Sequence, residues 1–263
     1  MQYFEWAEED EAAARAVLEA DQSQVKPFFR EKFERESTKM WNTFYRENGD
    51  RFFKDRHYLD SEFPVLLTPG ITVLEVGCGV GNAAFPLFER NPGISLQAVD
   101  FAPTAIDILR GNDLYARNRI EAAVCDITTQ VPAFFTPCDY VLMIFVLSAI
   151  APDLQRQAIL NATRHLQPGG CVLFRDYGKY DLAELRLASH QHNKLGEDYY
   201  LKQDGTRVFY FTKETLTARF ADFEEVENQY HYRLVENRKE ALRMKRVWIQ
   251  AVFRKGNARE LTV

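Results

Sequence analysis

Three glycines spaced two residues apart follow a short apolar run near residue 76, and this feature constrains the fold more than any other. The run and the glycines read Val73-Leu-Glu-Val-Gly-Cys-Gly-Val-Gly-Asn82. The run is typical of a buried parallel strand, and the glycines indicate a turn where backbone can approach a ligand closely. A second apolar run, 94–99, ends at Asp100, the position of a ribose-binding carboxylate. A plain turn with a solvent-facing Asp100 is the alternative interpretation.

The spacing of the glycines separates two classes of nucleotide site. A dinucleotide fingerprint has its last glycine one position later, in G-x-G-x-x-G, with an acidic residue about 20 positions on. Here the glycines are Gly77, Gly79 and Gly81. Strand, glycines and acid together resemble the S-adenosylmethionine (SAM) site of class I methyltransferases rather than a dinucleotide site.

Apolar runs and amphipathic segments alternate from residue 71 onward, which favours a doubly wound α/β fold. We expect strands at 71–76, 94–99, 120–124, 139–146, 171–175, 225–234 and 246–253, and helices at 82–89, 103–110, 153–166 and 213–221. Gln203-Asp-Gly-Thr206 lies between two aromatic runs and predicts an inserted hairpin. Seven strands fit the Rossmann-like sheet of a class I methyltransferase. The predicted divisions are an acidic leader (1–25), an N-terminal helical and aromatic extension that caps cofactor and RNA (26–70), a methyltransferase domain (71–255) and a tail (256–263).

The composition excludes several classes of protein. With 263 residues, 46% of them hydrophobic, the chain can bury one substantial core. No apolar stretch reaches the roughly 18 residues of a membrane span, and the acidic start is unlike a presequence. The four cysteines form no C-x-x-C pair and the histidines lack partners at zinc spacing, so we expect reduced thiols and no metal site. We expect a monomeric protein in the cytoplasm, with the nucleus as the alternative compartment, and no membrane association.

The net charge of −5 conceals an uneven distribution of charge. Residues 1–21 carry seven acids and one base, whereas residues 231–258 carry eight bases and two acids. Segment 22–58 holds nine Lys or Arg and six acids, interleaved with aromatic residues. Basic segments mixed with aromatics suit a polyanion with exposed bases. Ordinary solvated faces are the alternative.

Several stretches are far more specific than the glycine motif. They read Trp41-Asn-Thr-Phe-Tyr45, Phe52-Phe-Lys-Asp-Arg-His57, Ile144-Phe-Val-Leu-Ser-Ala149, Phe174-Arg-Asp-Tyr-Gly178, Asp204-Gly-Thr-Arg207 and Arg246-Val-Trp-Ile-Gln250. Over roughly residues 26–255 the chain resembles the tRNA N3-methylcytidine (m3C) methyltransferases, the methyltransferase-like 2/6/8 group and its fungal counterparts. The resemblance implies SAM as cofactor and the anticodon arm of specific tRNAs as partner. It implies N3 of cytidine 32 as the methylated atom.

The resemblance also implies a set of cofactor contacts, to which the glycine turn adds Gly79. The set is Trp41, Tyr45, Gly77, Asp100, Asp126, Ile127 and Ile144. Trp41 and Tyr45 share one helical face and could cap the sulfonium, although a helix that merely packs on the core would show the same pattern. Asp126 could accept from the adenine amino group, with a helix cap as the alternative, and Ile127 would pack on the ring. Ile144 lies in a buried run, so any contact it makes is incidental.

The residues after the fourth and fifth strands indicate which atom is methylated. Methylases of exocyclic amines carry an Asp/Asn-Pro-Pro-aromatic turn where this chain reads Ile144-Phe-Val-Leu-Ser148, so methylation of an amino group is disfavoured. Carbon-5 cytosine methylases need a nucleophilic cysteine at the carboxyl ends of the strands, whereas Cys138 precedes its strand and is therefore at the opposite edge. Cytosine N3 needs no general base, because its own lone pair attacks the methyl group, and the product is cationic. We therefore expect Asp176 and Tyr177 to stabilise the charge, and Arg56 and His57 to hold the target nucleotide. Surface pairs of Arg56 with Asp55 or of Arg175 with Asp176, and a solvated His57, are the alternatives.

Two other functions remain open at this stage. One is a small-molecule or protein methyltransferase on the same fold, and the other is a noncatalytic RNA-binding subunit with a vestigial cofactor site. Members of the family differ in their tRNAs, and some need seryl-tRNA synthetase. Two stretches look closer to the threonine-type members, Asn237-Arg-Lys239 and Arg246-Val-Trp-Ile-Gln250, and Lys194-Leu-Gly-Glu197 looks closer to the serine-type ones. These signals conflict, so the sequence does not choose the tRNA.

Overall fold

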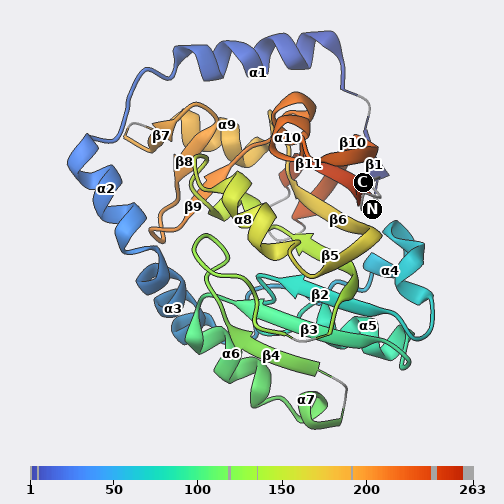
Figure 1. Cartoon of the computed structure of the whole chain (residues 1–263). Helices are drawn as coiled ribbons and strands as arrows, with labels where there is room; N and C mark the ends of the chain where they lie inside the picture. Colours follow the sequence, from blue (N-terminus) through green and yellow to red (C-terminus); the bar gives the residue numbers. More distant parts are fainter. Residues whose placement is uncertain are drawn as a thin grey trace, which may run out of the picture.

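A computed structural model of the chain describes residues 2–4, 6–117, 120–134, 136–190, 192–237 and 242–256. Its central sheet has the order β1-β10-β11-β6-β5-β2-β3-β4 (Figure 1). The seven long strands are β2 (Thr72–Val76), β3 (Ser95–Asp100), β4 (Ile120–Val124), β5 (Cys138–Ile144), β6 (Leu166–Tyr177), β10 (Phe223–Asn237) and β11 (Leu242–Lys255). The expected seven-stranded α/β sheet is confirmed, with a two-residue strand, β1 (Gln2–Tyr3), added at the edge beside β10.

The strand order reverses at β2, and this reversal determines where a ligand can bind. Strand β2 pairs in parallel with β3 on one side and with β5 on the other. The chain therefore leaves the sheet in opposite directions from neighbouring strands, which opens a crevice at their carboxyl ends. Strand β11 is antiparallel to both β6 and β10, so the sheet is mixed.

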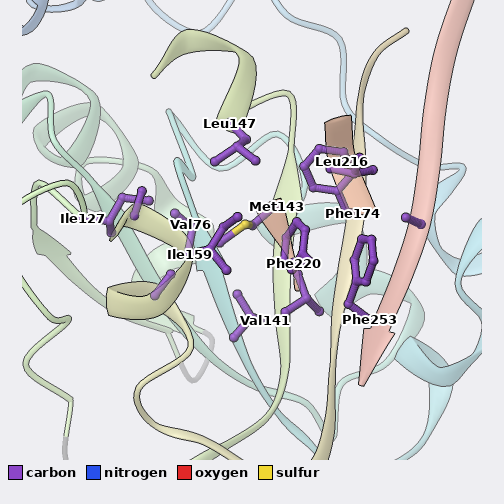
Figure 2. Close-up of a cluster of buried hydrophobic side chains, with 14 of the residues drawn as sticks. Val76, Ile127, Val141, Met143, Leu147, Ile159, Phe174, Leu216, Phe220 and Phe253 are labelled. Atoms are coloured by element: carbon purple, nitrogen blue, oxygen red, sulfur yellow. The ribbon is translucent and has the colours of Figure 1, made fainter. Parts of the chain in front are cut away.

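Helices cover both faces of the sheet, and two hydrophobic clusters hold them there. One cluster joins alternate residues of the strands, such as Val76, Met143 and Phe174, to Ile159 of α8 (Gln155–Ala162) and Leu216 of α10 (Lys213–Arg219) (Figure 2). The other takes the intervening strand residues and packs them on α5 (Ala84–Arg90) and α6 (Pro103–Arg110). Side chains alternate across a strand, so successive residues of each strand enter opposite clusters. The near-continuous apolar runs of the sequence therefore correspond to strands that are buried on both faces.

Several element boundaries differ from the sequence prediction, and the largest shift is at the start of β6. Helix α8 ends at Ala162, and β6 begins at Leu166, five residues earlier than expected. The added residues include Pro168, which is exposed at the start of the strand where the lack of an N–H is tolerated. Helix α9 (Leu182–Ala188) was not predicted, and the buried Asp181 caps it by accepting a hydrogen bond from the Ala183 N–H (2.8 Å).

The N-terminal part of the chain wraps around the sheet domain. Helix α1 (Glu8–Ala20) crosses above α9 and α10, and α2 (Pro27–Arg35) and α3 (Ser37–Asn48) descend along one side (Figure 1). The expected acidic leader is thus a strand and a helix fixed to the C-terminal half. Trp6 stacks between Tyr180 and Tyr232, at ring-centroid distances of 6.2 and 5.9 Å. Downstream of α3 lie α4 (Leu59–Glu62) and the 3-10 helix η1 (Pro64–Leu67).

The inserted hairpin is confirmed and contacts α3. Strands β8 (Tyr199–Leu201) and β9 (Arg207–Phe209) pair antiparallel, and β7 (Lys194–Gly196) completes a separate three-stranded sheet. Arg207 donates to the Ser37 hydroxyl (2.8 Å), and the Lys202 ammonium lies 5.6 Å from the Trp41 ring centroid. The hairpin therefore holds α3 against the carboxyl edge of the main sheet.

Candidate active site

The glycine turn after β2 leaves no room for side chains. Gly77 and Gly79 adopt φ angles of 62° and 53°, a region that other residues rarely occupy. A Cβ atom at residue 77 would lie 2.5 Å from a methyl group of Val146, and one at residue 79 would lie 2.8 Å from the Tyr45 hydroxyl oxygen. The turn thus brings α3 and the segment after β5 directly onto the backbone of the loop.

Asp100 at the end of β3 is tied to the same turn. Its carboxylate accepts hydrogen bonds from the backbone N–H groups of Gly79 and Ala102, each at 2.9 Å. Burial raises the pKa of Asp100 to about 6, although these N–H donors favour the charged form. Each oxygen keeps a lone pair, so the side chain can still accept from a ligand hydroxyl. A solvent-facing Asp100 is therefore excluded, because only 5% of the residue is exposed.

A cavity of about 270 Å³ opens at the carboxyl ends of β2, β3, β4 and β5. Its lining combines the predicted cofactor residues with the extension and the hairpin. The lining includes Trp41, Tyr45, Gly77, Asp100, Asp126, Ile127, Phe145 and Arg207. The volume, the aromatic cap and the buried carboxylate fit a nucleoside with an attached amino-acid chain.

Two of the predicted adenine contacts line this cavity. The Asp126 carboxylate accepts from the backbone N–H (2.9 Å) and the hydroxyl (2.7 Å) of Thr128. The residues that follow form a turn and not a helix, so the interpretation of Asp126 as a helix cap is wrong. Ile127 is buried beside it and extends the hydrophobic cluster of Figure 2 to the cavity.

Ile144 packs in the core, as its buried run indicated. The side chain belongs to the cluster on the α5 face and does not line the cavity. The next two residues, Phe145 and Val146, line it instead. A cofactor contact of Ile144 stays a prediction.

Glu75 is a buried acid below the turn to which the sequence interpretation gave no role. The residue is 4% exposed, and its Oε2 atom has no hydrogen-bond partner. Burial raises the pKa of Glu75 to about 8, opposed by the nearby positive charge of Arg56. The apolar run that encloses the glutamate in the sequence was the signal for this side chain.

The segment after β5 is held in an unusual conformation. Phe145 has a φ angle of 58°, and its N–H donates to the Arg175 carbonyl (2.8 Å). Three residues later, the Ser148 N–H donates to Asp176 Oδ2 (2.9 Å). A bulky residue in this region costs about 1–3 kcal/mol, which the surrounding contacts must offset. Strain of this kind occurs at functional sites.

Asp176 and Tyr177 lie where β6 ends, next to that segment. Asp176 is fully buried and also accepts from the Tyr177 N–H (2.9 Å). Burial raises its pKa to about 6, and the two N–H donors and Arg56 oppose the shift. The Tyr177 ring packs on Phe145 at a centroid distance of 4.8 Å. Neither residue lines the cavity; the pair lies behind Phe145, which does, and its catalytic role stays a prediction.

Arg56 reaches the same place from the extension. Its guanidinium carbon lies 5.1 Å from the Phe145 ring centroid, and Nη1 donates to the Tyr58 hydroxyl (3.3 Å). The Arg56 N–H donates to the Asn82 carbonyl (2.8 Å), which anchors the segment to the glycine turn. The pair of Arg56 with Asp55 is not formed, since Asp55 accepts from Asn82 instead (3.0 Å). His57 is exposed and does not join this group, so its role stays a prediction.

Arg175 points away from Asp176, to the other face of the sheet. Its guanidinium lies between the rings of Tyr58 and Trp248, 5.0 and 5.3 Å from their centroids, and pairs with Glu62 (3.3 Å). The residue is 1% exposed. The alternative of a surface pair between Arg175 and Asp176 is therefore wrong, and Arg175 instead fixes Tyr58, which holds Arg56.

Two of the described cations in the basic C-terminal segment are paired with acids of the same chain. Lys245 pairs with Asp10 (2.6 Å), and Arg246 pairs with the fully buried Asp181 (2.8 Å). Arg238, Lys239 and the side chain of Arg243 lie outside the described residues. Acids of the same chain thus pair with Lys245 and Arg246, two of the bases that the charge distribution suggested for RNA.

The described residues contain no group of three or more His, Cys, Asp or Glu side chains arranged to hold a metal ion. Within the same part of the chain, no helix is long and apolar enough to cross a membrane.

Comparisons with known proteins agree with this geometry. A family model described as a methyltransferase domain matches residues 74–172. Among solved structures, a SAM-dependent methyltransferase from Anabaena variabilis superposes with a TM-score of 0.63 at 15% identity, covering 83% of this chain and 94% of that one. One from Methanosarcina mazei superposes with a TM-score of 0.56 at 18% identity, covering 75% and 98%. The fold and the cavity define a class I SAM-dependent methyltransferase.

Sequence relatives narrow the class. The human tRNA N(3)-cytidine methyltransferase METTL6 is 43% identical over 249 residues, which cover 90% of this chain and 87% of that protein. The Drosophila melanogaster tRNA N(3)-methylcytidine methyltransferase Mettl2 is 41% identical, covering 96% and 82%. The tRNA(Thr) (cytosine(32)-N(3))-methyltransferase of Saccharomyces cerevisiae is 36% identical, covering 95% of this chain and 42% of that protein. The chain belongs to the tRNA N(3)-cytidine methyltransferase family.

Proposed function

We propose that this protein transfers a methyl group from SAM to N3 of cytidine 32 in the anticodon loop of specific tRNAs. The observation that carries the proposal is the meeting of Arg56, Phe145 and Asp176 beside the cavity at the carboxyl edge of the sheet. The names of the relatives supply the substrate class. SAM supplies, when bound, a methyl group on a positively charged sulfur.

The cavity residues fit that cofactor. Asp100 would take the ribose hydroxyls, Asp126 and Ile127 the adenine, and the backbone of Gly77 the amino-acid chain. Gly79 does not line the cavity but donates its N–H to Asp100, so its own cofactor contact stays a prediction. Trp41 and Tyr45 from α3 would close the cavity from above. Because Trp41 and Tyr45 belong to the N-terminal extension and the other residues to the sheet domain, bound SAM would contact both parts of the chain.

The group beside the cavity suits a base that becomes cationic. Cytosine N3 attacks with its own lone pair, so no residue has to remove a proton. The Asp176 carboxylate is held by two backbone N–H groups and stabilises the developing positive charge at short range. Cys125 lines the cavity, but burial raises the pKa of its thiol, which disfavours a nucleophilic thiolate.

The arriving RNA has a suitable surface beside the cavity opening. Phe28, Phe29 and Phe52 are 71, 46 and 58% exposed. They lie among exposed cations of α2, α3 and the following segment, which are Lys26, Arg30, Arg35, Lys39, Arg46, Arg51 and Lys54. Exposed rings among cations bind single-stranded nucleotides by stacking and by neutralising phosphates. We therefore place the anticodon loop over residues 26–54 rather than over the C-terminal strands.

Mapping modified cytidines in tRNA from cells that lack the protein tests the proposal. We expect loss of 3-methylcytidine at position 32 in a subset of tRNAs and its return with the intact gene. Unchanged modification at position 32 in every tRNA would contradict the proposal. Loss at another atom or position would favour a different methyltransferase function.

The choice of tRNA and the need for a synthetase are open to a direct assay. Purified protein with tRNA(Thr) and tRNA(Ser) transcripts, each with and without seryl-tRNA synthetase, separates the serine-type from the threonine-type behaviour. The monomeric state and the cytoplasmic or nuclear location stay predictions.

A further inference from the structure

Phe145 is one of two large aromatic residues with a positive φ angle in the part of the chain that the structure describes, the other being Tyr180, and it lies where two halves of the site meet. It lines the cofactor cavity. Its ring also contacts the group that holds Arg56 and Tyr177, at 5.1 Å from the guanidinium carbon and 4.8 Å between ring centroids. Among the described residues that line the cavity, no other has ring contacts with both Arg56 and Tyr177.

The backbone around Phe145 is fixed from three sides. Val146 packs on Gly77, the Phe145 N–H is bonded to the Arg175 carbonyl, and the Ser148 N–H is bonded to the Asp176 carboxylate. Phe145 has a positive φ angle, and its half-buried ring packs against the hydrophobic cluster that contains the preceding residue, Ile144, while it also lines the cavity. Glycine, or asparagine with its tolerance of this region, would occupy the position with less strain. Packing on that cluster offsets part of the strain, and the part of the ring that lines the cavity is left for a ligand.

We propose that Phe145 contacts the target base directly, presenting its ring to the pyrimidine that is methylated. This inference rests on the proposed function. Trp248, whose ring is 6.1 Å away at 78°, and Tyr177 support the ring from behind, and the side chain remains partly exposed toward the crevice. An aromatic face stacks on a flipped base and attracts it more strongly once it is cationic.

The Arg56 guanidinium lies close enough to this ring to contact a base that binds there. Arg56 now lies over Phe145 and is bonded to Tyr58, with Asp176 and Glu75 as the carboxyl groups that interact with it electrostatically. A base arriving on Phe145 meets the guanidinium at its edge, where the carbonyl oxygen of cytosine can accept a hydrogen bond. Phe145 thus supplies the platform and Arg56 the orientation.

Three substitutions separate a base contact from simple packing. Phe145→Leu keeps an apolar side chain, Phe145→Asn suits the backbone, and both lack the ring; Phe145→Tyr keeps it. Phe223→Leu, in a half-buried aromatic at the start of β10, is the matched control. The readouts are turnover on tRNA at saturating SAM, SAM affinity by calorimetry, and affinity for anticodon stem-loops that carry either cytidine or 3-methylcytidine at position 32.

We expect Phe145→Leu and Phe145→Asn to lower kcat by about tenfold or more, with SAM affinity changed by less than about threefold. Both should lose preference for the methylated stem-loop over the unmodified one, and Phe145→Tyr should retain activity and preference. Equal turnover of the leucine variant and the wild type, or an equal loss with tyrosine, would overturn the inference. An inactive wild-type protein would instead contradict the proposed function. The stem-loop affinities of the variants would still test whether the Phe145 ring contacts the base.

Discussion

The backbone N–H of Gly79 donates to the carboxylate of Asp100 at 2.9 Å, so the turn after the first long strand is bonded to the acid that ends the second. One hydrogen bond thereby joins the two sequence features that were the first to indicate a cofactor site. It also fixes the carboxylate in the cavity before any ligand arrives.

Asp100→Ala should weaken SAM binding by about tenfold or more, because a charged acceptor for two hydroxyls is worth about 1.5–3 kcal/mol. Calorimetric titration of the folded variant measures the change. Asp100→Asn is the control, since it keeps an acceptor for the Gly79 N–H and should fall between wild type and alanine. Unchanged affinity in the alanine variant would show that the cofactor lies elsewhere.

Trp41→Ala should reduce SAM affinity while the melting temperature of the apoprotein changes by only a few degrees. The ring is half-buried on α3, over the cavity and beside Tyr45 (5.9 Å between centroids), and it is outside the sheet core. Trp41→Phe retains an aromatic face and should keep most of the affinity. A large drop in melting temperature with normal affinity would assign Trp41 to packing alone.

Turnover at saturating SAM should fall as the pH drops through about 6, because burial raises the pKa of Asp176 to about that value and the charged form is the active one. The sign follows from the mechanism, since protonation removes the charge that offsets the cationic base. Asp100 has a similarly raised pKa, so its titration should appear in the SAM dissociation constant instead. A turnover that stays level from pH 5 to pH 8 would rule out the role of Asp176.

Glu75→Gln should flatten the pH dependence of apoprotein stability. Burial raises the folded-state pKa of Glu75 to about 8 from an ordinary value of 4.5, so its contribution is complete below the unfolded pKa and is lost as pH rises through the folded one. Between those values the loss is about 1.4 kcal/mol per pH unit. Urea unfolding at pH 6 and pH 8 should therefore show a smaller difference for the glutamine variant. An unaltered difference would mean that Glu75 titrates normally.

Reversing Arg51 and Lys54 to glutamate should weaken tRNA binding and flatten its salt dependence by up to about one unit per lost phosphate contact. SAM affinity should be unchanged, because neither side chain lines the cavity. The charge-matched control reverses Arg164 and Arg254, which lie at the amino edge of β6. If the control weakens binding and the test pair does not, the RNA lies on the opposite side of the sheet.

The sequence predicted the positions of the seven long strands along the chain and the glycine turn, because both depend on local patterns. Apolar runs mark strands buried on two faces, and the glycines occupy positive φ angles that other residues disfavour. The pairing of charged side chains could not be predicted in this way. Lys245 and Asp10 are 235 positions apart, and only the folded chain shows that they pair. The same holds for Arg175, whose direction follows from strand alternation once β6 is placed.

One predicted cofactor residue, Ile144, does not line the cavity, whereas the next residue does. The family resemblance pointed to Ile144, but the left-handed backbone places Phe145 in the cavity and leaves Ile144 in the core. A positive φ angle at a bulky residue such as Phe145 cannot be inferred from secondary-structure propensity or from hydrophobic periodicity. It became visible only through the contacts that hold it.

Methyl transfer from labelled SAM to purified tRNA transcripts, with the product base identified by mass spectrometry, tests the central claim most directly. We expect wild-type protein to form 3-methylcytidine on a transcript with cytidine at position 32 and none when position 32 is uridine. Asp176→Asn should bind SAM normally and turn over at least about tenfold more slowly. Label incorporated equally into both transcripts, or into another base, would contradict the account.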